Sequence, residues 1–172
     1  MKRRKIRRTL RAASRRSFAG AAVIAMLAAG AILAHRAAAQ YGGDSSTWPQ
    51  NAGGYFAASE ISKAEGRPMF VYFRTDWCPY CREFEHQLLG SGQVDSYLQG
   101  MARVRVNPEA GEREETLAGV YGVEGYPGIY WQRHPSAPPV RVSRTVRGAN
   151  GEARLKTPAE FIAGLRQAAA GK

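Results

Sequence analysis

The chain has 172 residues, enough for one domain and an additional segment, and its formal net charge is +11. Ten of the 25 basic residues fall within residues 1–40, which contain no acidic residue. The remaining 15 basic residues face 14 acidic ones, so the rest of the chain is almost neutral. This distribution removes the main argument for a nucleic-acid-binding protein.

Residues 1–39 have the composition of an export signal. A basic start is followed by an apolar run from Ala19 to Ala34 and by the small residues 37–39. Residues 14–18 (SRRSF) resemble the twin-arginine export signal of bacteria. The apolar run is shorter than the about 20 residues of a spanning helix. We therefore expect cleavage after Ala39, with an uncleaved anchor at residues 19–34 as the alternative, and in both cases the rest of the chain crosses the membrane.

The next segment leads into the predicted domain, which we place at residues 55–172. Residues 40–54 are rich in Gly, Ser and Asn and are interpreted as a linker or a loosely packed lead-in. A helix is predicted from about Tyr55 to Glu65, with Gly66 ending it. Residues 68–73 (PMFVYF) are typical of a buried strand, because they form a short apolar and aromatic run after a proline.

A second helix is predicted to begin at Pro79, where a proline suits the first helical turn. Cys81, Phe84 and Leu88 follow at helical spacing, and Gly90 can end this helix. Residues 102–106 are a second strand candidate, and residues 112–121 a third helix.

The last third of the chain predicts two strands and a helix. The strands are residues 129–131 and 140–146, joined by the proline-rich segment HPSAPP. Thr157, Pro158 and Glu160 form a helix-start signature for the C-terminal helix. A strand–helix–strand unit followed by an antiparallel pair indicates an α/β fold, in which helices flank a mixed central sheet.

Cys78 and Cys81 are the only cysteines, and three roles compete for them. A structural crosslink over so short a ring would contribute only roughly 2 kcal/mol, against about 4.7 for a ring of 100 residues. A structural zinc site needs four ligands, and only His86 and His134 remain after residue 40 to complete it. We therefore expect neither a metal nor another cofactor.

A redox-active pair explains the spacing of Cys78 and Cys81 better than a structural crosslink or a zinc site does. Cys78 would lie at the start of the helix beginning at Pro79, where backbone N–H groups and the helix dipole lower the pKa of a thiol. Cys81 would share the buried face of that helix. An exposed, reactive Cys78 and a sheltered Cys81 are what thiol–disulfide exchange requires.

The chain resembles thioredoxin-fold proteins over roughly residues 55–170. The resemblance lies in residues 69–73 (MFVYF), residues 76–81 (DWCPYC) and the pair Tyr126-Pro127 before a strand. Residues 66–85 are most similar to the C-terminal domain of the thiol:disulfide interchange protein DsbD and to related periplasmic proteins. The resemblance implies a thioredoxin-like fold and a periplasmic location.

It also implies roles for single residues. Pro127 would be a cis-proline that faces the cysteines, and Trp77, Tyr126 and Pro127 would contact substrate. Tyr72 stands where this family usually has a buried Asp. Glu85 could take over proton transfer, the alternative being a solvated glutamate on the helix surface.

These observations together predict an exported thiol–disulfide oxidoreductase, more specifically a reductase of protein disulfides. Its partners would be protein thiols and disulfides and a membrane redox protein, and it would be a monomer. A disulfide oxidase or isomerase and a non-catalytic binding module are the alternatives.

Overall fold

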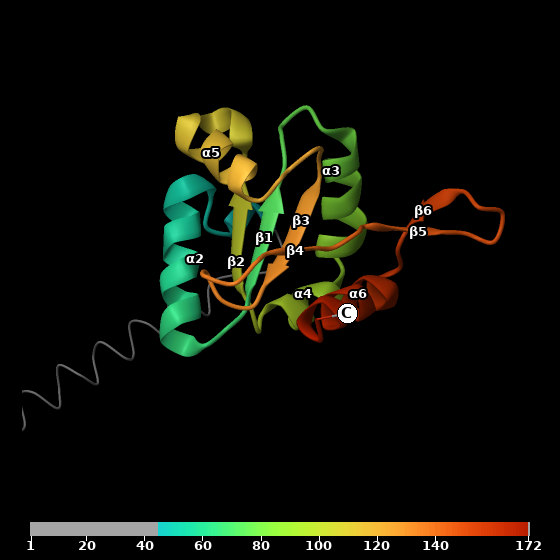
Figure 1. Cartoon of the computed structure of the whole chain (residues 1–172). Coiled ribbons are helices and arrows are strands. Elements are labelled where there is room, and N and C mark those ends of the chain that lie inside the picture. Colours follow the sequence, from blue (N-terminus) through green and yellow to red (C-terminus); the bar gives the residue numbers. More distant parts are fainter. Residues whose placement is uncertain (1–44, 172) are drawn as a thin grey trace, which may run out of the picture. The chain divides into compact units, whose positions relative to one another are not determined.

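The structure is a computed structural model that describes residues 45–171 (Figure 1). The predicted export signal at residues 1–39 lies outside the described residues. None of the helices within residues 45–171 combines the length and the hydropathy that a membrane span requires.

The described chain alternates helices and strands in the predicted order, with several additional elements. In chain order these are η1 (Ser45–Thr47), α2 (Asn51–Glu65), β1 (Met69–Phe73), α3 (Pro79–Phe84), the π-helical turn η2 (Glu85–Leu89), α4 (Gly92–Leu98), β2 (Ala102–Val106), η3 (Pro108–Ala110), α5 (Glu112–Val120), β3 (Gly128–Gln132), β4 (Val140–Arg141), β5 (Thr145–Arg147), β6 (Ala153–Leu155) and α6 (Pro158–Ala169).

The central sheet has the strand order β2-β1-β3-β4. Strand β1 pairs in parallel with β2 and antiparallel with β3, so that Met69 lies opposite both Ala102 and Gln132. Strand β3 pairs antiparallel with the short β4. The predicted α/β fold with a mixed sheet is therefore confirmed.

Both faces of the sheet are covered by helices, which explains why all five residues of β1 are buried. Side chains alternate across a strand. Phe70 and Tyr72 pack into a core with residues of α3, α4 and α6. Met69, Val71 and Phe73 pack on the other face with residues of α2 and α5. A strand buried on both faces has no polar alternation, as the continuous apolar run predicted.

The start of α6 has the predicted capping box. The Thr157 side chain accepts the backbone N–H of Glu160, and the Glu160 carboxylate accepts the backbone N–H of Thr157. Arg154 on β6 also donates to this carboxylate, at 2.6 and 2.8 Å. This arginine and the capping contacts lower the pKa of Glu160 from 4.5 to about 2.

A pH dependence follows from this carboxylate. Because its folded-state pKa is the lower one, ionised Glu160 contributes stability above pH 4.5, and the contribution is lost as the pH falls through about 2. We expect urea unfolding of Glu160→Gln to resemble wild type at pH 2 and to show lower stability at pH 7. An NMR titration of Glu160 with a midpoint near 4.5 would contradict this prediction.

Helix α2 begins earlier than predicted. The prediction of a linker at residues 40–54 is therefore wrong for residues 45–54. It starts at Asn51, and Trp48 is 3% exposed. The Trp48 ring packs edge-on against Phe70, with a centroid distance of 5.7 Å, and the Arg103 guanidinium lies over it. Residues 45–54 therefore belong to the folded unit, because a tryptophan in this segment completes the core.

The predicted strand at residues 140–146 is wrong in its extent. Val140 and Arg141 pair with β3, the Val142 N–H still donates to the Ile129 carbonyl, and Thr145–Arg147 form a separate two-stranded sheet with β6. Ser143 causes the break, since its hydroxyl accepts the N–H of Thr145 and donates to the carbonyl of the same residue.

Helix α4 was not predicted. The β5–β6 hairpin projects away from the central sheet (Figure 1).

Candidate active site

The two cysteines form a disulfide at the start of α3, with a Cα–Cα distance of 5.3 Å. Cys78 is the N-cap residue and Pro79 follows in the first turn, as predicted. The backbone N–H of Cys81 donates to the Cys78 sulfur at 3.1 Å. A backbone donor aimed at this sulfur would also stabilise a Cys78 thiolate after reduction.

The expected difference in exposure between the cysteines is not present in this oxidised state. Cys78 is 1% exposed and Cys81 is fully buried. Both belong to the core between the sheet and α3, against which Tyr126 packs. The correction has a physical cause, since the disulfide ties the Cys78 sulfur to a partner that lies inside the core.

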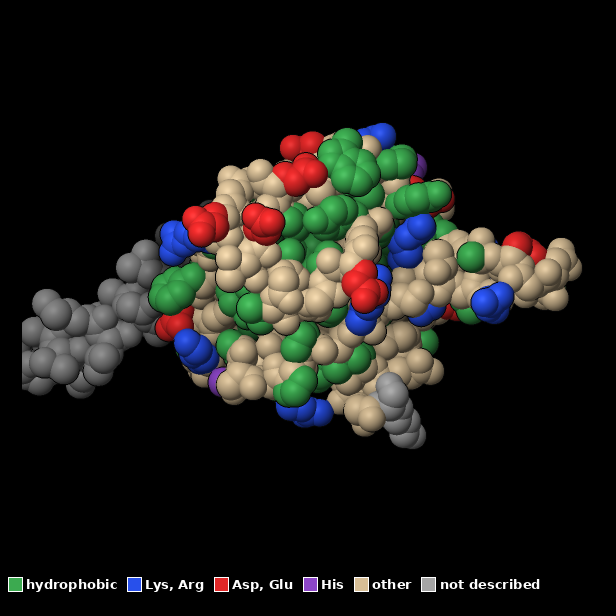
Figure 2. All heavy atoms as spheres, turned by 45° about the horizontal axis from the view of Figure 1, so that its top comes forward, with side chains coloured by type: hydrophobic (Ala, Val, Ile, Leu, Met, Phe, Trp, Pro, Cys, Tyr) green, Lys and Arg blue, Asp and Glu red, His purple; other side chains and the backbone are tan. Residues whose placement is uncertain are grey.

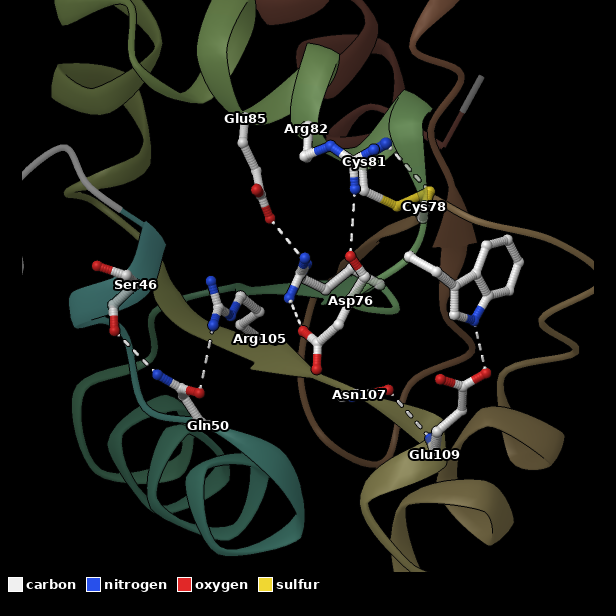
Figure 3. Close-up of polar contacts among 12 residues, drawn as sticks. Ser46, Gln50, Asp76, Cys78, Cys81, Arg82, Glu85, Arg105, Asn107 and Glu109 are labelled. Carbon is white, nitrogen blue, oxygen red and sulfur yellow. Dashed lines mark hydrogen bonds and ion pairs between the residues drawn. A yellow bond between two sulfur atoms is a disulfide. The ribbon is translucent and has the colours of Figure 1, made fainter.

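Two of the three predicted substrate-binding residues, Trp77 and Tyr126, contact each other at the cysteine helix. Trp77 is 62% exposed, and its ring packs edge-on against Tyr126 at a centroid distance of 6.2 Å. The Trp77 indole N–H donates to Glu109 of η3 at 2.8 Å (Figure 3). The Tyr126–Pro127 peptide bond is cis, as the resemblance implied. The exposed Trp77 directly precedes Cys78, and the partly buried Tyr126 packs against the core that contains both cysteines.

Glu85 belongs to a half-buried polar network and not to a solvated helix face. Tyr72, which is fully buried, donates its hydroxyl hydrogen to the Glu85 carboxylate at 3.0 Å. The guanidinium of Arg74 lies 3.0 Å from the same oxygen and 2.6 Å from Asp76 (Figure 3). Burial, and then the Glu85 carboxylate, raise the pKa of Tyr72, which keeps this hydroxyl protonated as a donor.

The sequence analysis missed three residues that contact the predicted site or its helix. Arg74 follows β1 directly but has no recognisable motif. Glu109 lies 32 residues from Trp77. Arg144 lies 61 residues from Glu83, with which it forms an ion pair of 3.1 Å, and its guanidinium lies over the ring of Tyr80 at 4.6 Å. None carries a local signal, because each contact depends on the folded chain.

The site offers no arrangement of side chains suited to a metal. Within residues 45–171 no three His, Cys, Asp or Glu side chains are grouped as metal ligands. The chemistry available is that of the disulfide, with the backbone N–H of Cys81 and the Glu85 network nearby.

The match to a family model supports the predicted thioredoxin-like fold. Residues 49–130 match a family model described as thioredoxin-like. A thioredoxin from Thermus thermophilus is 25% identical over 72% of this chain and 92% of its own, with a TM-score of 0.49. The oxidised DsbD C-terminal domain of Neisseria meningitidis is 20% identical over 66% and 90%, with a TM-score of 0.48. No curated protein matches the chain.

Proposed function

We propose that the protein is an exported thiol–disulfide oxidoreductase that reduces disulfides of other proteins in the periplasm, a proposal supported by the match of residues 49–130 to the thioredoxin-like family model. The observation that carries the proposal is the Cys78–Cys81 disulfide at the start of α3, with the Cys81 backbone N–H directed at the Cys78 sulfur. The basic, apolar and small-residue order of residues 1–39 supports export.

The reaction transfers two electrons from the cysteine pair to a client disulfide. The Cys78 thiolate attacks one client sulfur, forms a mixed disulfide and releases the other client sulfur as a thiolate, which takes up a proton. Cys81, once deprotonated, attacks the Cys78 sulfur. This step releases the second client thiol and forms the Cys78–Cys81 disulfide. A dithiol partner in the membrane then reduces this disulfide and is itself oxidised.

Glu85 is the proposed proton acceptor for Cys81. The two residues are four positions apart along the continuous helical segment of α3 and η2, so they are neighbours on its surface. The contacts with Tyr72 and Arg74 hold the Glu85 carboxylate at the inner side of this segment. Trp77, Tyr126 and Pro127 are proposed to contact the client on either side of its reactive sulfur.

The reduction potential of residues 40–172 tests the direction of electron transfer. We expect a value near about −270 mV, in the range of disulfide-reducing proteins, when the pair is equilibrated against a dithiothreitol buffer. A value near about −120 mV would instead make the protein a disulfide donor. If the two cysteines form no disulfide at any potential, the redox proposal is wrong and a binding module remains.

A further inference from the structure

An open pocket of about 460 Å³ has the cis-proline Pro127 in its lining. One wall consists of Gly125, Tyr126 and Pro127, and the other is formed by residues 141–145. The second wall adjoins the first turn of α3, because the Arg144 guanidinium lies over the ring of Tyr80, which precedes Cys81. An extended segment bound along Pro127 would therefore place its side chains in this pocket.

The charged groups lining this pocket are two arginines. Arg144 is held in place by Tyr80 and by its 3.1 Å ion pair with Glu83, and its side chain is 20% exposed. The Arg141 side chain is 54% exposed, and its contact with Glu124 is a long 3.6 Å to a carboxylate that is itself 85% exposed. A contact of that kind is weak and exchangeable, so the positive charge of Arg141 is available to a ligand.

The opposite side of Tyr126 has the opposite charge. A second pocket there is lined by Glu109, Glu112 and Glu115 together with Tyr126. Figure 2 shows acidic side chains gathered over α5, and basic side chains interspersed with acidic ones on the part of the face nearer the β5–β6 hairpin. Tyr126 thus lines one pocket whose charged side chains are arginines and a second pocket whose charged side chains are glutamates.

We propose that the arginine pocket selects clients that carry an acidic side chain near their reactive cysteine. The acidic side chain binds between Arg141 and Arg144 while the client sulfur faces Cys78. The inference rests on the proposed function and names its substrate class. Electrostatic complementarity of this kind changes the association rate and the choice of partner more than it changes maximal affinity.

The test uses short peptides with one cysteine, blocked as a mixed disulfide with uncharged 2-mercaptoethanol. Two aspartates are placed before or after the cysteine, and matched peptides carry lysines instead. The fully reduced protein is mixed with each peptide, and the released peptide thiol is quantified after acid quenching. We expect one aspartate peptide to react roughly three- to tenfold faster than its lysine match at low salt, where the Debye length is about 30 Å, with the difference fading near 1 M salt.

Variants identify the charge responsible. Arg141→Glu is expected to abolish or invert the preference, and Arg141→Gln to reduce it. Arg147→Glu is the matched control, since this exposed arginine on β5 does not line the pocket. The rate of reduction of uncharged bis(2-hydroxyethyl) disulfide is measured for each protein, and each peptide rate is expressed relative to it.

The outcomes separate the inference from the proposed function. Equal rates for acidic and basic peptides, with normal reduction of the uncharged disulfide, would overturn the arginine pocket and leave the oxidoreductase intact. Failure to reduce any disulfide would contradict the proposed function alone. In that case, binding of the same peptides with serine for cysteine still tests the pocket, since an acidic preference lost in Arg141→Glu would support it and equal binding would overturn it.

Discussion

Replacing Cys81 by alanine is expected to turn the protein into a trap that stays covalently bound to its client. Cys78 can still attack a client disulfide in this variant, but no second thiol can resolve the mixed disulfide. Replacing Cys78 by serine is expected to lower the exchange rate by roughly 10³-fold or more, because the nucleophile itself is lost. Non-reducing electrophoresis after incubation with a disulfide-containing protein measures both effects.

The double variant Cys78→Ser/Cys81→Ala is the control for non-specific capture. It should form no adduct, and dithiothreitol should release the adduct of the single Cys81→Ala variant. A Cys81→Ala protein that binds the same partners as wild type, without a covalent bond, would contradict the enzymatic proposal. Such a result would favour a thioredoxin-fold binding module.

Most elements of the fold could be predicted because their signals are local. The end of α2 at Gly66 is one example, since this glycine adopts φ 67° and closes the helix there. Thr157 and Glu160 at the start of α6 are another, because the capping contacts lie within four residues. Strand β1 was recognisable from its uninterrupted apolar sequence.

The elements that were missed lack such signals. Helix α4 has only seven residues, and Val94 and Leu98 are its only buried side chains, too few to show a helical period. Its one clear sign is Ser91, whose hydroxyl accepts the N–H of Val94. The end of β4 depends on the hydrogen bonds of Ser143, which compete with strand pairing.

The candidate site also has a part that the sequence predicts and a part that it does not. The cysteine pair and its helix start are adjacent in sequence, so their arrangement followed from spacing. The Arg144 contact with Tyr80 and the Glu109 contact with Trp77 join distant parts of the chain and could not be predicted. The role of Tyr72 was also hidden, because only the fold shows that its hydroxyl reaches Glu85.

The second large effect is expected from replacing Glu85, which contacts Tyr72 and Arg74. Arg74 has a side chain only 10% exposed, and Glu85 and Asp76 are its two ion-pair partners. Removing one partner leaves a mostly buried cation less well compensated, which costs about 3–5 kcal/mol when the pair is fully buried. Glu85 is 22% exposed and Asp76 remains in place, so we expect Glu85→Gln to lower the unfolding free energy by about 1–3 kcal/mol.

Glu83→Gln is the matched control for this substitution. Glu83 lies on the same helix and pairs with Arg144, but its side chain is 40% exposed, so its loss should cost only about 0–1 kcal/mol. Combining Glu85→Gln with Arg74→Met should cost less than the sum of the two single changes, because the buried cation is gone. Strict additivity in urea unfolding would contradict a coupled network.

Rates then distinguish a structural role of Glu85 from proton transfer. If the Glu85 carboxylate accepts the proton of Cys81, Glu85→Gln should slow resolution of the mixed disulfide by about 10²-fold or more at neutral pH, under conditions in which the variant is fully folded. The deficit should shrink as the pH rises, because hydroxide can then deprotonate the thiol directly. The attack by Cys78, measured separately in the Cys81→Ala background, should be almost unchanged. A resolution rate equal to wild type in the folded variant would confine Glu85 to holding Arg74 and Tyr72 in place.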